Sequence, residues 1–340
     1  MSRRVQLVLL AAGAALFAGL VHRIGVAQII ANASAVGWLF GPILLLYGVA
    51  YACNTSAWRL TMGTEAPRPG FWRTYAMTVS GFSLNFVTPM VNAGGEPYRV
   101  AALAPWLGRR RAATSVVLHK MLNSLALLLV WITALLLGLA MLPRVPAVIA
   151  PTSFALGVVS LLAAIILTGH QRGGLQRTLD LLHRAPLLDR LARTLEPRRE
   201  TLAEMDRQIA DFYHASPRRF WGALALEYGS RALWMVEYWL ICYGVGIEVT
   251  FAQAFLIAGL SSIVQNAFFF VPYELGTKEG SLYALFDLTG LDPRAGVYTA
   301  IVSRARDILW IAGGLGLLAI TRHRTTETGP IAGTPVKPAA

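Results

Sequence analysis

The sequence has few charged residues for its length. Asp, Glu, Lys and Arg together make up 14% of the 340 residues, whereas an average soluble domain carries about 25%. Hydrophobic residues make up 55% of the chain, which is more apolar side chain than a core of ordinary size can bury. This balance excludes a disordered chain, a fibrous protein and a water-soluble globular protein. We therefore expect lipid to surround most of the chain.

Several chemical motifs are also missing. Cys53 and Cys242 are the only cysteines, and without a CxxC spacing neither a zinc site nor a disulfide framework is expected. The chain has no HExxH sequence and no GxxxxGK[ST] loop, the motifs of a zinc protease and of a nucleotide-phosphate site. No pair of carboxylates or nucleophile–base pair stands out. We expect no metal, no cofactor, no nucleic-acid partner and no enzymatic activity.

Apolar stretches close to the length of a membrane span recur along the chain. A helix needs about 20 apolar residues to cross the hydrocarbon core. The candidates are 5–21, 36–58, 74–91, 113–142, 147–168, 219–244, 252–271 and 295–320. The first stretch follows the sequence MSRR and is longer than the apolar core of about 7–15 residues in a signal peptide. We interpret it as the first span.

The cations are concentrated between these stretches. The net charge is +12, and arginines cluster at the N-terminus, in loops 59–73 and 105–112, in segment 169–218 and after residue 320. The positive-inside rule places these clusters in the cytoplasm. We expect a multi-pass protein of a bacterial inner membrane with both termini cytoplasmic. Residues 1–320 form the membrane domain, 169–218 a basic surface segment and 321–340 a disordered tail.

The first basic loops require a re-entrant hairpin. Loops 59–73 and 105–112 are both basic, yet one apolar segment separates them, and a single span would put them on opposite sides. We predict that 74–88 enters the membrane, that TPMVNAGGEP turns within it, and that 97–104 returns. Proline and glycine favour such a break, and the residues expected to form it are Pro89, Gly94, Gly95 and Pro97.

The second half of the chain repeats this design. Segment 252–271 enters, VPYELGTKEG breaks the helix at Pro272, Gly276 and Gly280, and 280–288 returns. Its flanks are poor in arginine, so this hairpin enters from the other side. We predict an all-α bundle of about six full spans and two re-entrant hairpins, in which the halves 1–142 and 147–320 form an inverted repeat. Transporters with such repeats bind substrate at broken helices near the midplane.

Charged and polar residues within the apolar segments are the candidate site. A charge is costly at this depth and usually functional. Short helices that begin near residues 97 and 280 would also direct free backbone N–H groups into the membrane, where they attract anions. We expect a lipid head-group cavity formed by Asn85, Asn92, Glu96, Arg99, Lys120, Lys278, Glu279, Arg304, Arg306 and Asp307.

A structural interpretation of these charges stays open. Glu96–Arg99 and Arg304–Asp307 have i,i+3 spacing and Glu227–Arg231 has i,i+4 spacing, so each pair suits an ion pair on one helix. A glutamate in the first turn also stabilises a helix as a cap. The same alternatives apply to Glu237. His119 is more typical of a hydrogen-bonded interior histidine than of a ligand.

Both break segments resemble a known family. SLNFVTPMVNAGGEPYRVAAL resembles the N-x-x-x-P…G-G-E…R segment, and VPYELGTKEGSLYALFDLTGLDP the Pro–Gly–x–x–Glu–Gly segment, of the lysylphosphatidylglycerol synthase transmembrane, or flippase-like, family (UPF0104). The resemblance spans residues 5–320. Tyr273 and Glu274 depart from it, because small residues and glycine are common there. The added bulk and charge of these two residues affect the expectation about which lipid is carried, but not the expected fold.

The resemblance implies an inner-membrane fold. In multidomain members it also implies movement of aminoacylated phosphatidylglycerol between leaflets. Those members carry an aminoacyltransferase domain after the membrane part, so lysyl transfer is not expected of this chain. Members of this length include proteins associated with hopanoid biosynthesis, which makes a hopanoid one candidate cargo.

The leading hypothesis is a lipid translocator. It would move an anionic or polyol-headed lipid, whether a phospholipid, a hopanoid or a polyprenyl-linked lipid, through a polar cavity at the two hairpins. The alternatives are an accessory protein that presents lipid to a biosynthetic enzyme and a secondary transporter of a small anion. The expected partners are membrane lipids, together with enzymes of lipid biosynthesis in the accessory case.

Overall fold

The computed structural model describes residues 36–63, 68–88, 94–169, 216–268, 274 and 276–327, with isolated positions between 207 and 213. Several sequence predictions fall outside the described residues. They are the first span at 5–21, the residues Pro89, Asn92 and Pro272, most of segment 169–218, and residues 328–340.

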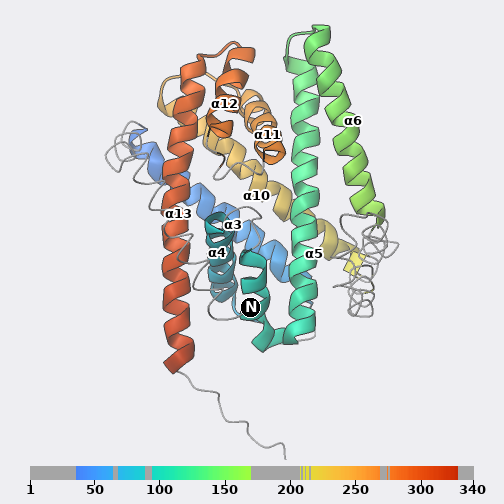
Figure 1. The fold of residues 1–340 in the computed structure, drawn as a ribbon, viewed down its shortest axis with the longest axis vertical. Helices are drawn as coiled ribbons and strands as arrows, with labels where there is room; N and C mark the ends of the chain where they lie inside the picture. Colours follow the sequence, from blue (N-terminus) through green and yellow to red (C-terminus); the bar gives the residue numbers. More distant parts are fainter. Residues whose placement is uncertain are drawn as a thin grey trace, which may run out of the picture.

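The described residues form helices and no strands, so the predicted all-α class is confirmed (Figure 1). A short 3-10 helix, η1 (Gly37–Leu39), leads into the first long helix. The α-helices are α3 (Phe40–Thr61), α4 (Phe71–Val87), α5 (Gly95–Met141), α6 (Pro146–Gly169), α10 (Pro217–Gly244), α11 (Phe251–Ala267), α12 (Thr277–Leu288) and α13 (Pro293–Glu327).

Three described helices are long and apolar enough to cross a membrane, namely Gly37–Thr61, Gly95–Met141 and Pro146–Leu167. The predicted spans 219–244 and 295–320 correspond to α10, with 28 residues, and α13, with 35. Both exceed the about 20 residues that a crossing needs, but each carries charged side chains, which lower its hydropathy. Several of these charges are buried against neighbouring helices, so the two helices face protein on one side.

The predicted first break lies between α4 and α5. α4 ends at Val87 and α5 begins at Gly95, where Asn85 Oδ1 accepts a 2.6 Å hydrogen bond from the Gly95 N–H. Pro97 lies in the first turn of α5, where a proline N–H is not needed. Gly108, with φ 75° and ψ 156°, interrupts α5 and separates a short returning arm from a long helix.

The second break lies between α11 and α12. α11 ends at Ala267, and α12 begins after Gly276, whose φ of 82° suits glycine. Gly280 lies within the first turn of α12. Figure 1 shows α4 and the start of α5 in one half of the molecule and α11 and α12 in the other.

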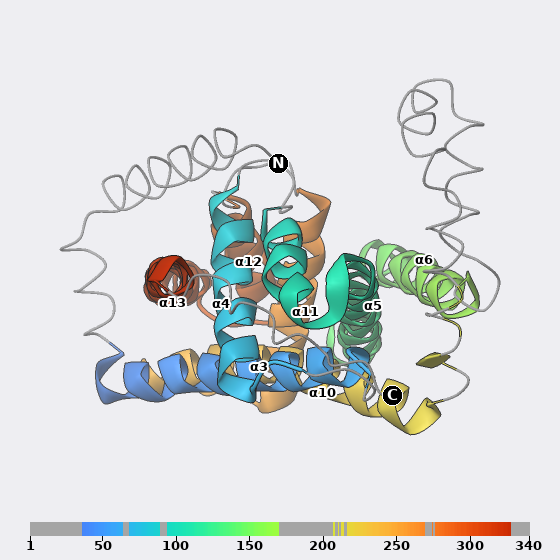
Figure 2. The same ribbon diagram turned by 90° about the horizontal axis from the view of Figure 1, so that it is seen from below.

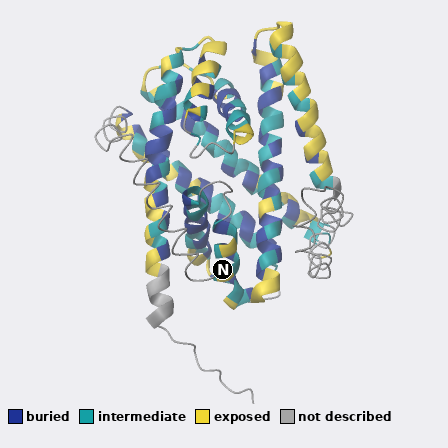
Figure 3. Ribbon diagram, viewed as in Figure 1, coloured by how far each residue is buried: buried dark blue, intermediate teal, exposed yellow. Residues whose placement is uncertain are grey.

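Helices α3 and α10 cross the molecule together and form a layer along one of its faces. Figure 2 shows them side by side, and the hydrogen bonds Ser230 Oγ to Ala50 O and Arg219 Nη2 to Leu60 O make them antiparallel. Helix α6 lies at the outside. Its apolar side chains are exposed, as for Phe154 at 75% (Figure 3), which is the surface expected of a helix that faces lipid.

Gly95 lies directly against the backbone of α4, and this contact gives a first prediction. A Cβ at Gly95 would collide with the carbonyl oxygen of Gly81, so Gly95→Ala forces the hairpin arms apart. Overpacking of this kind costs about 1–3 kcal/mol, and we expect a lower melting temperature in detergent. Gly157→Ala on α6 is the control, because nothing lies within 4 Å of its Cβ and alanine favours a helix. A melting temperature of Gly95→Ala equal to that of the control would contradict the close packing.

Candidate functional site

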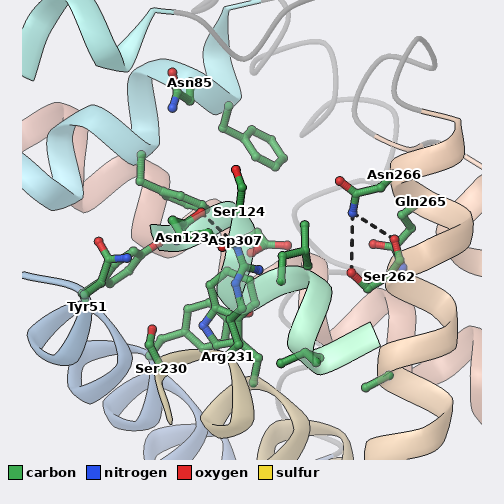
Figure 4. Close-up of a pocket in the computed structure, with 18 of the residues that line it drawn as sticks. Tyr51, Asn85, Asn123, Ser124, Ser230, Arg231, Ser262, Gln265, Asn266 and Asp307 are labelled. Carbon is green, nitrogen blue, oxygen red and sulfur yellow. Dashed lines mark hydrogen bonds between the residues drawn. The ribbon is translucent and has the colours of Figure 1, made fainter. Parts of the chain in front are cut away.

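A cavity of about 640 Å³ lies between the two hairpins. Residues from α3, α4, α5, α10, α11, α12 and α13 line it. The predicted site residues among them are Asn85, Arg99, Lys120, Lys278, Arg306 and Asp307. Figure 4 shows the cavity between side chains of the two halves, with Tyr51 and Asn85 on one side and Gln265 and Asn266 on the other.

The remaining predicted residues lie beside the cavity or outside the described part of the chain. Glu96, Glu279 and Arg304 form ion pairs and do not line the cavity, and Asn92 is not described. In the described part of the chain, no group of three or more His, Cys, Asp or Glu side chains is placed to hold a metal ion.

One ion-pair network connects α10, α12 and α13. Glu237 is fully buried and accepts two hydrogen bonds from Arg306, at 3.0 Å to Nε and 2.7 Å to Nη2. Arg306 Nη1 donates to Asp307 at 2.7 Å, and Lys278 Nζ lies 3.6 Å from the same carboxylate. The two cations balance the two anions, so the network is neutral as a whole. Such a bidentate arginine pair fixes both position and orientation.

A second ion pair holds the α11–α12 hairpin. Arg304 Nη2 donates to Glu279 at 2.9 Å and to the Glu274 carbonyl at 3.1 Å, and Glu279 in turn accepts from the Gly276 N–H at 2.9 Å. Arg304 thus reaches back to the break, whereas Asp307 faces Arg306 and Lys278.

The first hairpin has a corresponding contact, and it differs from the i,i+3 alternative. Glu96 pairs with Lys120 Nζ at 3.1 Å and accepts from Asn85 Nδ2 at 3.2 Å, so its partner is not Arg99. Arg99 is buried at 8% exposure and donates through Nη2 to the Thr78 carbonyl at 3.2 Å. Its guanidinium lies 5.7 Å from the centre of the Trp58 ring.

Glu227 lies in a polar cage made by three helices. Its carboxylate accepts from Asn54 Nδ2 at 2.9 and 3.0 Å and from Asn123 Nδ2 at 2.7 Å, and it lies 2.9 Å from His119 Nε2. Arg231 donates at 2.8 Å to Asn123 Oδ1 rather than to Glu227. The i,i+4 ion pair is therefore replaced by a contact through an amide. His119 is the hydrogen-bonded interior histidine that the sequence favours.

A stack of side chains joins the two charge clusters. Tyr47 and Trp234 are parallel, with an interplanar angle of 2° and ring centroids 5.6 Å apart. Arg306 lies 3.5 Å from the Tyr47 centroid, and Arg231 lies 5.5 Å from the Trp234 centroid. Two arginines thus contact one aromatic pair, and these cation–π contacts stabilise charges that are out of water.

Two arginines give the cavity wall its positive charge. Arg99 and Arg231 both line the cavity, and their Nε atoms are enclosed by protein without an acceptor among the described residues. Buried polar groups are ordinarily paired, so these guanidinium groups are less fully satisfied than is usual. Neither Arg99 nor Arg231 has a carboxylate within ion-pair distance in the described part of the chain, so the wall that they form is positive.

Sequence reasoning missed much of this wall. Tyr47, Tyr51, Asn54, Asn123 and Trp234 were not candidates. For Asn123 a signal existed, because it follows His119 by four residues and therefore lies on the same helix face. The others come from helices far apart in the sequence, and only the fold brings them together.

Comparison with known proteins gives one match. A family model described as the lysylphosphatidylglycerol synthase TM region matches residues 5–316. No curated protein matches the chain, and no solved structure matches it.

Proposed function

Because the chain belongs to the family of the lysylphosphatidylglycerol synthase TM region, we propose that it moves a lipid with an anionic head group between the two leaflets of a bacterial inner membrane. The family match and the apolar helices indicate a membrane protein with a lipid-related role. The proposed activity forms and breaks no covalent bond. It requires a polar site for the head group and a way for that site to reach both leaflets.

The two arginines in the cavity wall carry the proposal. Arg99 and Arg231 line one wall without a carboxylate partner among the described residues. Phosphate oxygens accept charge-assisted hydrogen bonds from guanidinium groups, often two at a time. Away from water these contacts are stronger than at a surface. A phosphate-bearing head group therefore supplies the negative charge that these two cations lack as a partner.

The two hairpins suit a path for the lipid head group from one leaflet to the other. They enter from opposite halves of the molecule and meet at the cavity, the arrangement in which alternating access exposes one site to each side in turn. Part of the lining is apolar, including Phe82, Leu127 and Met235. This surface suits the first carbons of a lipid, while the acyl chains remain in the bilayer.

A vesicle assay tests the proposal. The purified protein is reconstituted into liposomes that contain fluorescent NBD-labelled phosphatidylglycerol in both leaflets, and dithionite destroys the label that it can reach. We expect the protein to raise the dithionite-accessible fraction of label above that of protein-free liposomes, because label from the inner leaflet reaches the outer one. A label on phosphatidylcholine, which has no net charge, controls for leaks and for head-group choice.

The other outcomes identify the alternatives. Unchanged label accessibility for every anionic lipid tested would overturn translocation. Lipid binding without movement would then favour an accessory protein that presents lipid to an enzyme. Uptake of radiolabelled inorganic phosphate without lipid movement would instead favour a transporter of small anions.

A further inference from the structure

Glu227 and His119 stand apart from the other charged contacts in the bundle. Resting on the proposed function, we propose that these two residues form a proton-binding pair that couples proton uptake to the binding of an anionic head group in the cavity. Glu227 is 0% exposed and His119 is 2% exposed, and Oε1 lies 2.9 Å from Nε2. The pair therefore lies in the protein interior and beside the cavity, since His119 is part of its lining.

In the described part of the chain, no lysine or arginine contacts the carboxylate of Glu227. Glu237, Glu279 and Asp307 each contact an arginine, and Glu96 contacts a lysine. The cage of Glu227 contains the two neutral amides of Asn54 and Asn123 and one imidazole. A buried charge is costly unless it is paired. One proton therefore decides whether this pair is neutral or carries one negative charge.

The surroundings of Glu227 link it to the cavity wall. Asn123 donates to Glu227 and accepts from Arg231, so a single amide connects the carboxylate with the unpaired guanidinium. Attraction between Glu227 and the cations Arg99 and Arg231 acts across the same space. Other titratable groups on the packed helices include Tyr47, Tyr51 and Cys53 on α3, of which Cys53 interacts with the charge of Glu227, and Lys120 on α5, which is paired with Glu96.

The positive charges of Arg99 and Arg231 stabilise the negative charge of Glu227. An anion bound to these two arginines offsets their positive charge and so removes this stabilisation. Uptake of one proton from water, onto the imidazole or the carboxylate, then lowers the free energy of the Glu227–His119 pair, because the protonated pair is neutral. No other bond forms or breaks. Because coupling between two ligands is reciprocal, anionic lipid binds more tightly when the proton is present. A proton gradient across the membrane is then a source of energy for movement of the lipid.

Calorimetry measures this coupling directly. Dihexanoyl phosphatidylglycerol is titrated into the purified full-length protein in detergent at pH 6, 7 and 8. Each titration is repeated in two buffers of different ionisation enthalpy, which yields the number of protons taken up. We expect uptake approaching one proton per lipid and an affinity that falls toward higher pH, by at most about tenfold per pH unit for one linked proton. Dihexanoyl phosphatidylcholine is the probe without net charge.

Three variants locate the proton. Glu227→Gln removes the carboxylate of the proposed pair, so we expect no proton uptake and an affinity that no longer varies with pH. His119→Gln keeps a donor for Glu227 without an imidazole, and we expect proton uptake to fall by at least half. His119→Gln also tests the pair if the Glu227→Gln variant fails to fold. Glu248→Gln removes an exposed carboxylate beyond α10 and should keep the pH dependence of the wild type.

The outcomes separate the coupling from the function. Binding of the anionic lipid without proton uptake at any pH would overturn the coupling and leave the proposed function standing. Proton uptake that persists in both Glu227→Gln and His119→Gln would assign the proton to another group and overturn the pair. Absence of anionic lipid binding in the wild type at every pH would instead count against the proposed function.

Discussion

Replacing Glu237 with glutamine is expected to lower the free energy of unfolding by about 3–5 kcal/mol, the usual cost of leaving a buried charge without its partner. Glu237 is fully buried, and both of its oxygens accept from Arg306, at 3.0 and 2.7 Å. Glutamine retains one acceptor oxygen and presents an NH2 group to the guanidinium in place of the other. Arg306 would then keep its contacts with Asp307 and Tyr47, which do not replace a bidentate carboxylate.

Thermal unfolding in detergent measures this effect. Glu248→Gln makes the same chemical change at an exposed position and should leave the free energy of unfolding within about 0.5 kcal/mol of the wild type. Arg306→Gln combined with Glu237→Gln removes one cation and one anion, and we expect it to recover part of the lost stability, since replacing both partners of a buried pair is often near neutral. A single variant as stable as Glu248→Gln would show that the pair does not hold α10 to α13.

The two helix breaks could be predicted because their causes are local. Proline and glycine interrupt a helix wherever it lies, and the basic loops on both sides of 74–104 fixed the direction of the first hairpin. The structure ends α4 at Val87 and begins α5 at Gly95, and it ends α11 at Ala267 and begins α12 at Thr277. These boundaries agree with the predicted breaks because no tertiary contact is needed to create them.

The ion pairs could not be predicted, because the rule behind the alternatives considers one helix at a time. Spacing of i,i+3 or i,i+4 describes neighbours on a helix exposed to water. In a bundle within lipid, a charged side chain faces the protein interior, and the groups that it meets there come from other helices. Glu227 and Asn54, which share two hydrogen bonds, are 173 residues apart. No spacing in the sequence records such a contact.

The same argument explains why the aromatic part of the wall was missed. From the sequence, Tyr47 and Trp234 are interpreted as ordinary residues of apolar helices, because an aromatic residue in such a helix normally packs against neighbours or anchors the helix at the membrane interface. Their role depends on being stacked on each other and on contacting Arg306 and Arg231. The antiparallel packing of α3 on α10 creates both conditions.

Arg99→Met is expected to separate function from stability. The change removes one guanidinium from the cavity wall, and a hydrogen bond to a charged group contributes about 1.5–3 kcal/mol. We therefore expect the affinity for dihexanoyl phosphatidylglycerol to fall about 10- to 100-fold, with slower movement of labelled phosphatidylglycerol in vesicles. Arg231→Gln should have a similar effect on binding, because its guanidinium is likewise without a carboxylate among the described residues.

Stability should move in the opposite direction. Arg99 is buried, its Nε has no acceptor among the described residues, and its Nη2 donates to the Thr78 carbonyl inside α4. Methionine restores the apolar contact with Trp58 and removes the cost of a buried charge, so we expect a melting temperature equal to or above that of the wild type. Arg294→Met is the matched control, since this arginine has a side chain that is 89% exposed and should change neither property. A site retained for its ligand loses binding and gains stability on such a replacement, whereas a structural arginine loses stability first. Reduced stability with unchanged lipid affinity in Arg99→Met would therefore assign Arg99 to packing and remove it from the site.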